Sequence, residues 1–303
     1  MPAIETNELG KRFGDDIFAL DGVDLRVKEG EIFGFLGPNG AGKSTTINIL
    51  LDFVRPTSGS ATVLGMDAQD QSQEIRRRTG VLPEGYQVYG RLTGRQHVQF
   101  VIDSKKVDDN PDALLERVGI PEAADRKAGE YSKGMKQRLT LAMALVGEPE
   151  LLILDEPSTG LDPAGAREIR EIVREEAERG ATVFFSSHIM EQVEAVCDRV
   201  GILRAGELVA VDSIDGLREA AGDGATLRVE LAAVTDDAIA VVEGVEGVTE
   251  VNRRDGGLTV SVGNGSKTRV LSALEDAGHE VTDFRTEETS LEEIFMSYTE
   301  GSR

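Results

Sequence analysis

Residues 37–45 read Gly37-Pro38-Asn39-Gly40-Ala41-Gly42-Lys43-Ser44-Thr45 and fit the pattern G-x-x-x-x-G-K-[ST] at every fixed position. The apolar run 32–36 ahead of this stretch predicts a buried strand, and residues 46–51 behind it predict a helix packed on that strand. The loop is therefore expected between a strand and a helix, which is the context in which this pattern forms a phosphate-binding loop.

Each part of this loop has a chemical reason to contact phosphate. The glycines at 37, 40 and 42 let the backbone turn tightly, so that its N–H groups and the start of the helix converge on one anion. Lys43 adds a positive charge where β- and γ-phosphates would lie, and the Ser44 hydroxyl is suited to Mg²⁺. Thr45 is expected to cap the helix or to contact the α-phosphate. All nine residues are thus candidate nucleotide contacts.

Two further strands are predicted to end in polar side chains. Residues 151–154 are apolar, as in a buried strand, and Asp155 and Glu156 follow them directly; His188 follows a second such run, 181–187. Open α/β sheets hold their ligands at the carboxyl ends of the strands, so the three side chains are expected at one crevice. Asp155 can hold Mg²⁺, Glu156 can take the proton of an attacking water, and His188 can donate a hydrogen bond to a phosphate oxygen.

Two more features are candidates for nucleotide contact. Ser132 and Gly134 stand at the start of a predicted helix, where a hydroxyl, close backbone approach and free N–H groups suit a second anion. Phe13 stands just before the first predicted turn, where its ring could stack on an adenine. An ordinary helix cap and plain core packing are the respective alternatives.

The composition limits partners and compartment. The 303 residues include 55 acidic and 33 basic side chains, a formal charge of −22. Nucleic-acid binding depends on clustered Lys and Arg, so no nucleic-acid partner is expected. No run approaches the roughly 18 apolar residues of a membrane helix, and the first residues do not resemble a secretion signal. Cys197 is the only cysteine, which agrees with a reducing, cytoplasmic location.

The distribution of charge suggests a halophilic protein. Carboxylates occur in pairs at 15–16, 108–109, 236–237 and 287–288, and arginine outnumbers lysine. Such a surface is stable where salt screens its self-repulsion, as in a salty cytoplasm. An ordinary acidic protein is the alternative.

The phosphate-binding loop, the segment 132–137, Asp155-Glu156, Leu161-Asp162 and His188, in this order and spacing, resemble the nucleotide-binding subunit of ATP-binding cassette (ABC) transporters. The resemblance covers roughly residues 2–215. It implies a homodimer that encloses two ATP molecules with Mg²⁺, each between the loop of one chain and Ser132 and Gly134 of the other. It also implies a separate integral membrane permease, with this subunit peripheral on the inner face of the cell membrane.

A narrower resemblance is to the daunorubicin-resistance and related export subfamily. Glu84 stands where the family usually has glutamine, and residues 290–295 read Ser290-Leu291-Glu292-Glu293-Ile294-Phe295. This resemblance implies ATP-driven export, with a permease contact over the loop from Glu84 to Tyr89. It also makes Glu84 a candidate Mg²⁺ ligand.

The predicted fold class is α/β, with a P-loop ABC ATPase core and helical subdomain in residues 1–219. A small α+β domain is predicted in residues 226–303, after a glycine-rich linker over 220–225. The order β, α, β, β, α, β expected over 226–286 suggests that this second domain is ferredoxin-like. A closing helix is expected over 291–298.

Three other functions are alternatives. A soluble ABC ATPase of DNA repair inserts a long coiled coil between P-loop and signature, but Lys43 and Ser132 are too near for one. A translation factor of the superfamily usually carries two cassettes, and this chain has one. A GTP-binding switch needs an Asn-Lys-x-Asp run, which the sequence does not contain.

Overall fold

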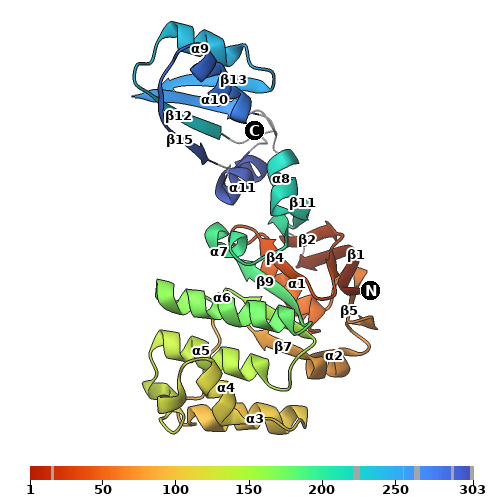
Figure 1. Ribbon diagram of the computed structural model, residues 1–303. Helices are drawn as coiled ribbons and strands as arrows, with labels where there is room; N and C mark the ends of the chain where they lie inside the picture. Colours follow the sequence, from red (N-terminus) through yellow and green to blue (C-terminus); the bar gives the residue numbers. More distant parts are fainter. Residues whose placement is uncertain (15–16, 221–225, 255, 263–266, 288–289, 301–303) are drawn as a thin grey trace. The chain divides into compact units, whose positions relative to one another are not determined.

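The computed structural model describes residues 1–14, 17–220, 226–254, 256–262, 267–287 and 290–300 (Figure 1). The chain divides into two compact units, Met1–Val211 and Asp212–Arg303. Each unit has its own sheet and its own hydrophobic core. The acidic pair 15–16, most of the predicted linker 220–225 and part of the pair 287–288 lie outside the described residues.

Unit 1 begins with a five-stranded antiparallel sheet. The strand order is β2-β1-β5-β6, and β3 also pairs with β1. The strands are β1 (Pro2–Phe13), β2 (Ile17–Val23), β3 (Arg26–Lys28), β5 (Ser58–Val63) and β6 (Met66–Asp67). The sheet therefore joins the chain start to the segment that follows the first helix.

The central sheet of unit 1 has six strands in the order β11-β10-β4-β9-β8-β7. Adjacent strands from β10 to β7 are parallel. The strands are β4 (Ile32–Leu36), β7 (Thr79–Leu82), β8 (Leu151–Asp155), β9 (Thr182–Ser187), β10 (Arg199–Arg204) and β11 (Glu207–Ser213). Strands β4, β8 and β9 are buried along their whole length, as parallel strands covered on both faces are.

The helices of unit 1 cover this sheet and form a separate helical part (Figure 1). They are α1 (Lys43–Leu50), α2 (Ser72–Arg78), α3 (Gly94–Lys105), α4 (Pro111–Arg117), α5 (Lys133–Leu145), α6 (Pro163–Glu178) and α7 (Met190–Glu194), with short 3-10 turns at Pro121–Ala123 and Ala128–Glu130. Helices α3, α4 and α5 pack against one another. Helix α5 also packs on β7, which ties this helical part to the sheet.

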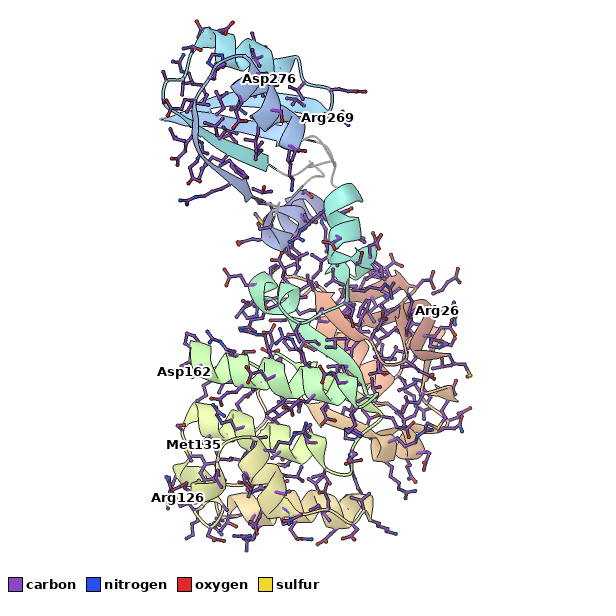
Figure 2. All side chains as sticks on the ribbon, viewed as in Figure 1. Arg26, Arg126, Met135, Asp162, Arg269 and Asp276 are labelled. Atoms are coloured by element: carbon purple, nitrogen blue, oxygen red, sulfur yellow. The ribbon has the colours of Figure 1, made fainter. Side chains whose placement is uncertain are left out.

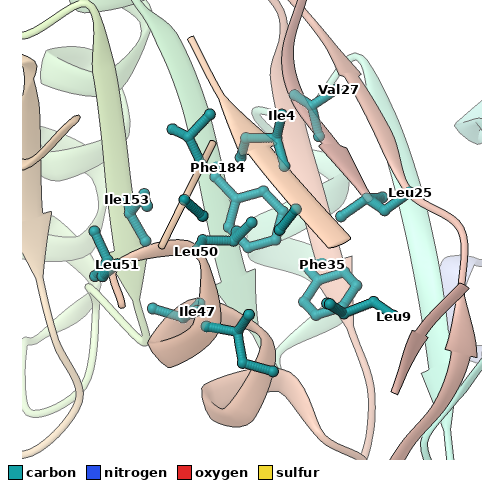
Figure 3. Packing of buried hydrophobic residues seen from close by; sticks show 14 of the residues in the cluster. Ile4, Leu9, Leu25, Val27, Phe35, Ile47, Leu50, Leu51, Ile153 and Phe184 are labelled. Carbon is teal, nitrogen blue, oxygen red and sulfur yellow. The ribbon is translucent and has the colours of Figure 1, made fainter. Parts of the chain in front are cut away.

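The main core of unit 1 gathers apolar side chains from both sheets and α1 (Figure 3). Phe33 stacks on Phe184 with ring centroids 6.0 Å apart, and the Phe35 ring lies 5.1 Å from that of Phe184. All three rings are fully buried. Burial of one such side chain stabilises the fold by about 1.5–3 kcal/mol. This core therefore fixes β4 and β9, the strands that lead into the phosphate-binding loop and His188.

The segment after β7 is anchored by a buried histidine. His97 on α3 is 2% exposed, and its Nε2 accepts the Tyr89 N–H at 3.0 Å. Its Nδ1 donates to the Thr93 carbonyl oxygen at 2.7 Å. The imidazole also stacks on the Tyr89 ring, with centroids 6.3 Å apart. His97 therefore holds the end of the segment from Glu84 to Tyr89 against α3.

Unit 2 contains a four-stranded antiparallel sheet in the order β13-β14-β12-β15. Its elements are α8 (Ile214–Ala220), β12 (Thr226–Leu231), α9 (Asp236–Glu243), β13 (Val248–Arg254), β14 (Gly257–Val262), α10 (Lys267–Asp276), β15 (Val281–Glu287) and α11 (Leu291–Glu300). Apolar side chains of the sheet, α9 and α10 form its core. Helix α8 packs on α11, so residues 214–219 group with unit 2, whereas the sequence analysis ends the first domain at 219.

Among the helices in the described part of the chain, none combines the length and apolar character that crossing a bilayer requires.

Candidate functional site

The candidate site lies at the carboxyl edge of the central sheet, where four parallel strands end. Strand β4 leads into Gly37, β9 into His188, β8 into Glu156 and β7 into Glu84. In the sheet these strands are adjacent, in the order β4-β9-β8-β7. The topology therefore gathers loops that are far apart in the sequence, at the edge where open α/β sheets hold ligands.

A cavity of about 340 Å³ opens at this edge. Its lining residues in the described part of the chain are Ile17, Phe18, Ala19, Pro38, Asn39, Gly40, Gly42, Lys43, Ser44, Thr45, Glu84 and Glu156. The volume falls within the range of about 300–1,000 Å³ that small-molecule pockets have. The phosphate-binding loop, Glu84 and Glu156 thus share one cavity.

The loop reaches its shape through Gly42. Its φ of 114° lies in the region that favours glycine, and a Cβ there would stand 2.5 Å from the Ala19 carbonyl oxygen. Helix α1 starts at the next residue, Lys43, and no side chain of the described residues caps it. Its first N–H groups are therefore available to an anion, which the helix dipole also favours.

Lys43 points back into the loop. Lys43 is only 8% exposed. Its Nζ donates to the carbonyl oxygens of Gly37 at 2.5 Å and Pro38 at 3.4 Å. The ammonium group is therefore held at the centre of the loop, where it can meet a bound phosphate.

Asp155 lies next to the loop and is held by two serines. Its Oδ1 accepts the Ser186 hydroxyl at 2.8 Å, and its Oδ2 accepts the Ser44 hydroxyl at 3.4 Å. Burial raises the pKa of Asp155; the hydrogen bond from Ser186 opposes this shift, and the charge of Glu84 adds to it. Asp155 and Ser44 thus offer oxygen ligands at one point, the donor type that Mg²⁺ prefers.

Glu156 is the buried acid that faces the cavity. The residue is 6% exposed and has a φ of 51°, and its N–H donates to the Ser186 carbonyl oxygen at 3.0 Å. Its Oε1 accepts His188 Nδ1 at 2.8 Å, and its Oε2 accepts the Ser187 hydroxyl at 3.4 Å. The end of β9 therefore supplies three groups that hold this acid. The sequence analysis did not single out Ser186 or Ser187, because a serine inside a buried strand gives no signal of its own.

The start of α5 is a separate feature. Ser132 is its N-cap and accepts the Met135 N–H at 3.2 Å, and a Cβ on Gly134 would stand 3.2 Å from Leu161 Cδ2. Figure 2 labels Met135 at the start of α5 and Asp162 at the start of α6. Neither Ser132 nor Gly134 is among the described residues that line the cavity. One chain thus carries two candidate anion-binding features, and they do not share a cavity in the described structure.

The aromatic residue that lines the cavity is Phe18. It is 60% exposed, and its neighbour Ile17 is 63% exposed. Phe13 is 42% exposed at the end of β1, with Lys11 Nζ 4.9 Å from its ring centroid, and it is not among the described lining residues. The sequence analysis did not name Phe18. The feature that could have pointed to it is its position at the start of β2, the strand that pairs with the end of β1 where Phe13 lies.

Described residues contain no group of three or more His, Cys, Asp or Glu side chains able to hold a metal ion. A Mg²⁺ site made of one hydroxyl, one carboxylate and phosphate oxygens does not require such a group of side chains.

Two family models match this chain. Residues 20–159 match the model described as ABC transporter, and residues 213–299 match the model described as ATP-binding protein DrrA1-3-like, C-terminal domain.

Relatives match over most of the chain. The daunorubicin resistance ATP-binding protein DrrA3 of Streptomyces coeruleorubidus is 34% identical, over 99% of this chain and 97% of its own. The linearmycin resistance ATP-binding protein LnrL of Bacillus subtilis is 30% identical, over 98% of both chains. The bacitracin transport ATP-binding protein BcrA of Bacillus licheniformis is 41% identical, over 71% of both.

Solved structures are similar over 70–73% of this chain. An ATP-binding subunit of an ABC transporter has a TM-score of 0.68 at 29% identity, over 73% of this chain and 93% of its own. The dimeric bacterial ABC transporter cassette MJ0796 has a TM-score of 0.65 at 25% identity, over 70% of this chain and 98% of its own. These matches favour a transporter ATPase over the DNA-repair, translation-factor and GTP-switch alternatives. The chain therefore belongs to the DrrA-like group of ABC transporter ATP-binding proteins, and it is an ATPase that hydrolyses ATP to ADP and phosphate.

Proposed function

We propose that two copies of this chain close on two molecules of ATP and thereby drive a separate membrane permease. The chain is the ATP-binding subunit of an ABC exporter, and a solved cassette of this family is dimeric. One observation carries the proposal: Glu156, hydrogen-bonded to His188, lines the same cavity as Lys43 and Ser44. A proton acceptor, a phosphate cradle and a candidate cation ligand thus meet at one point.

We assign the chemistry to this chain's residues as follows. The N–H groups of the loop and of the start of α1 bind the phosphates, and Lys43 exchanges its contact with Gly37 for the β- and γ-phosphates. Glu156 accepts the proton of the attacking water. His188 holds the carboxylate of Glu156 and contacts the γ-phosphate. A positioned general base contributes about 10²- to 10⁴-fold in rate.

The donor set fits Mg²⁺. Ser44 Oγ and Asp155 Oδ2 are 3.4 Å apart, so a hydroxyl and a carboxylate oxygen, the donor type that Mg²⁺ prefers, could hold the ion together. When bound, Mg²⁺ would supply positive charge that offsets the negative charge of the phosphates. Glu84 lines the cavity and its charge raises the pKa of Asp155. A cation near both carboxylates would relieve that repulsion, so we keep Glu84 as a candidate ligand.

The second half of each ATP site would come from the partner copy. Ser132 and Gly134 offer a hydroxyl and a close backbone approach at a helix start that lies outside the cavity of their own chain. Two copies facing each other would bring each helix start to the other chain's loop. The incomplete pocket supports a homodimer.

The segment from Glu84 to Tyr89 is the proposed permease contact. Tyr86 is 37% exposed and Tyr89 is 67% exposed, and exposed apolar side chains grouped in a loop mark partner sites. A subunit that docks there would be peripheral on the cytoplasmic, inner face of the cell membrane. No nucleic-acid partner is part of this proposal.

We also infer that unit 2 is a ferredoxin-like accessory domain. The order β12, α9, β13, β14, α10, β15 with one antiparallel sheet supports this assignment. We keep an ATPase domain over 1–219 and an accessory domain over 226–303 as functional divisions.

The assignment of the base is tested by Glu156→Gln. The variant should bind Mg-ATP and cleave it about 10²- to 10⁴-fold more slowly, because the amide cannot accept the proton of water. Glu191→Gln, at an exposed position on α7, is the matched control and should keep the normal rate. ATP retained on the protein and ADP formed are measured together. If Glu156→Gln turns over like the control, the base lies elsewhere.

A further inference from the structure

Gln137 joins the helix that begins at Ser132 to the backbone of Glu156. It lies on α5, five residues after the N-cap Ser132. Its side-chain Nε2 donates to the carbonyl oxygen of Pro157 at 2.8 Å and to that of Glu156 at 3.3 Å. Both partners are acceptors, so only a donor at this position can make these contacts.

The backbone that accepts the hydrogen bonds of Gln137 is strained at Glu156. Glu156 has a φ of 51°, a left-handed conformation that is unfavourable for a residue other than glycine. Strained residues persist where several contacts determine them. Here the Glu156 N–H donates to Ser186 at 3.0 Å, and its carbonyl oxygen accepts the Thr159 N–H at 3.1 Å besides Gln137. The direction of the Glu156 side chain depends on this conformation, because φ and ψ fix where the Cβ points.

Helix α5 therefore begins at a candidate anion site, and its residue Gln137 is hydrogen-bonded to the backbone of Glu156, the proposed base. An α-helix rises about 1.5 Å per residue, so Ser132 and Gln137 are separated by roughly 7.5 Å along a rigid element. A shift of the start of α5 would be carried to the carbonyl oxygens of Glu156 and Pro157.

We infer that Gln137 is a positioning residue that couples nucleotide contact at Ser132 to the orientation of the Glu156 carboxylate. The inference rests on the proposed function, in which Ser132 meets the ATP held by the partner copy. It explains how a base in one cavity responds to nucleotide bound at another surface of the same chain. Gln137 itself does not touch substrate.

The test uses two variants in which residue 137 cannot donate these hydrogen bonds. Gln137→Met keeps length and helix propensity but has no donor, and Gln137→Glu keeps shape but presents oxygens to two carbonyl oxygens. Losing one or two hydrogen bonds corresponds to a fall in kcat of about 5- to 100-fold. The KM for ATP should change by less than about 2-fold. Gln99→Met is the matched control, because Gln99 is an exposed helix residue bonded only to Asp103 in the described structure.

A second measurement separates positioning from simple destabilisation. In a Glu156→Gln background Gln137→Met should lower the residual rate no further, because residues that act as a unit are not additive. The thermal midpoint of Gln137→Glu is recorded beside that of Gln99→Met. An equal loss of kcat and ATP affinity, or a normal kcat in both Gln137 variants, would overturn the inference. Normal turnover by Glu156→Gln would instead overturn the proposed function, so the two failures are distinct.

Discussion

His188 Nδ1 donates to Glu156 Oε1 at 2.8 Å, so a half-exposed imidazole holds a buried carboxylate. The side chain of Glu156 is 7% exposed and that of His188 is 56% exposed. Because Glu156 lines the cavity, the ring of His188 fixes the orientation of an acid that a ligand in the cavity can reach.

Replacing His188 should slow hydrolysis more than it weakens binding. His188→Ala removes one of the two side-chain groups that hold the Glu156 carboxylate, leaving the Ser187 hydroxyl at 3.4 Å. A charge-assisted hydrogen bond contributes about 1.5–3 kcal/mol, which corresponds to a kcat lower by roughly 10- to 100-fold. Steady-state kinetics with ATP measure this fall in kcat. His279, whose Nε2 lies 3.1 Å from the exposed Asp237 in unit 2, offers the control His279→Ala. A His188→Ala enzyme with the control's kcat would exclude this role.

Asp155 should make the nucleotide-free protein less stable as pH rises. Burial raises the pKa of its carboxyl above the unfolded value of about 3.9, so the folded chain holds a proton that the unfolded chain has released. The stabilising contribution is complete below the unfolded pKa and is lost as pH rises through the higher folded pKa. Asp155→Asn removes the titrating carboxyl, so the variant should not lose this stability as pH rises.

Asp155→Asn is expected to raise the free energy of unfolding at pH 7, and this gain should shrink toward pH 4. Urea unfolding of both proteins across this pH range measures it. The amide oxygen that this substitution introduces can still accept the Ser186 hydroxyl, and the Ser44 hydroxyl can accept from the amide N–H instead of donating to Oδ2, so the main change is the loss of the charge. A variant less stable than the parent at pH 7 would contradict the sign.

The adenine contact can be assigned by two aromatic variants. Phe18 lines the cavity, whereas Phe13 does not in the described part of the chain. Stacking of one base on an aromatic ring contributes about 1–3 kcal/mol, so Phe18→Ala should weaken ATP binding by roughly 5- to 100-fold. Phe13→Ala should have the smaller effect. Equilibrium binding measures the loss of ATP affinity in each variant. A larger loss in Phe13→Ala than in Phe18→Ala would assign the adenine contact to Phe13.

The acidic surface predicts stabilisation by salt. Raising ionic strength from ~0.1 M to ~1 M shortens the Debye length from about 10 Å to about 3 Å, which screens the repulsion of a chain with net charge −22. The thermal unfolding midpoint should rise with KCl over this range. A midpoint that stays level or falls would remove the hypothesis of a halophilic protein and leave an ordinary acidic one.

The features that the sequence predicted well are those with local signals. The phosphate-binding loop has its own pattern, and the apolar run ahead of Asp155 identifies a buried strand, which the structure has as β8. Their placement at one edge follows from the rule for parallel sheets, and β4, β9 and β8 are adjacent. The order of elements in unit 2 is also the predicted one, because alternating strands and short amphipathic helices are separated by turn residues.

What the sequence could not predict depends on contacts between distant residues. Ser186 touches Asp155 from the next strand, across a parallel register that no local pattern encodes. The buried bonds of His97 to Tyr89 and Thr93 likewise become visible only once β7 and α3 are placed. Helix α8 was missed because its run, 214–220, is short and contains a glycine, although Ser213 stands before it and its hydroxyl accepts the Gly216 N–H at 3.0 Å.

The central claim is that one chain holds only half of each ATP site, and the mass of the Glu156→Gln variant in solution tests it most directly. Light scattering is recorded with and without saturating Mg-ATP, at a salt concentration where the protein is folded. Ser132→Arg in the same background is the control, because a bulky cation there would block the partner's nucleotide. The account predicts that Mg-ATP doubles the mass of Glu156→Gln and leaves the control a monomer. A Glu156→Gln protein that binds Mg-ATP and remains a single subunit would contradict it.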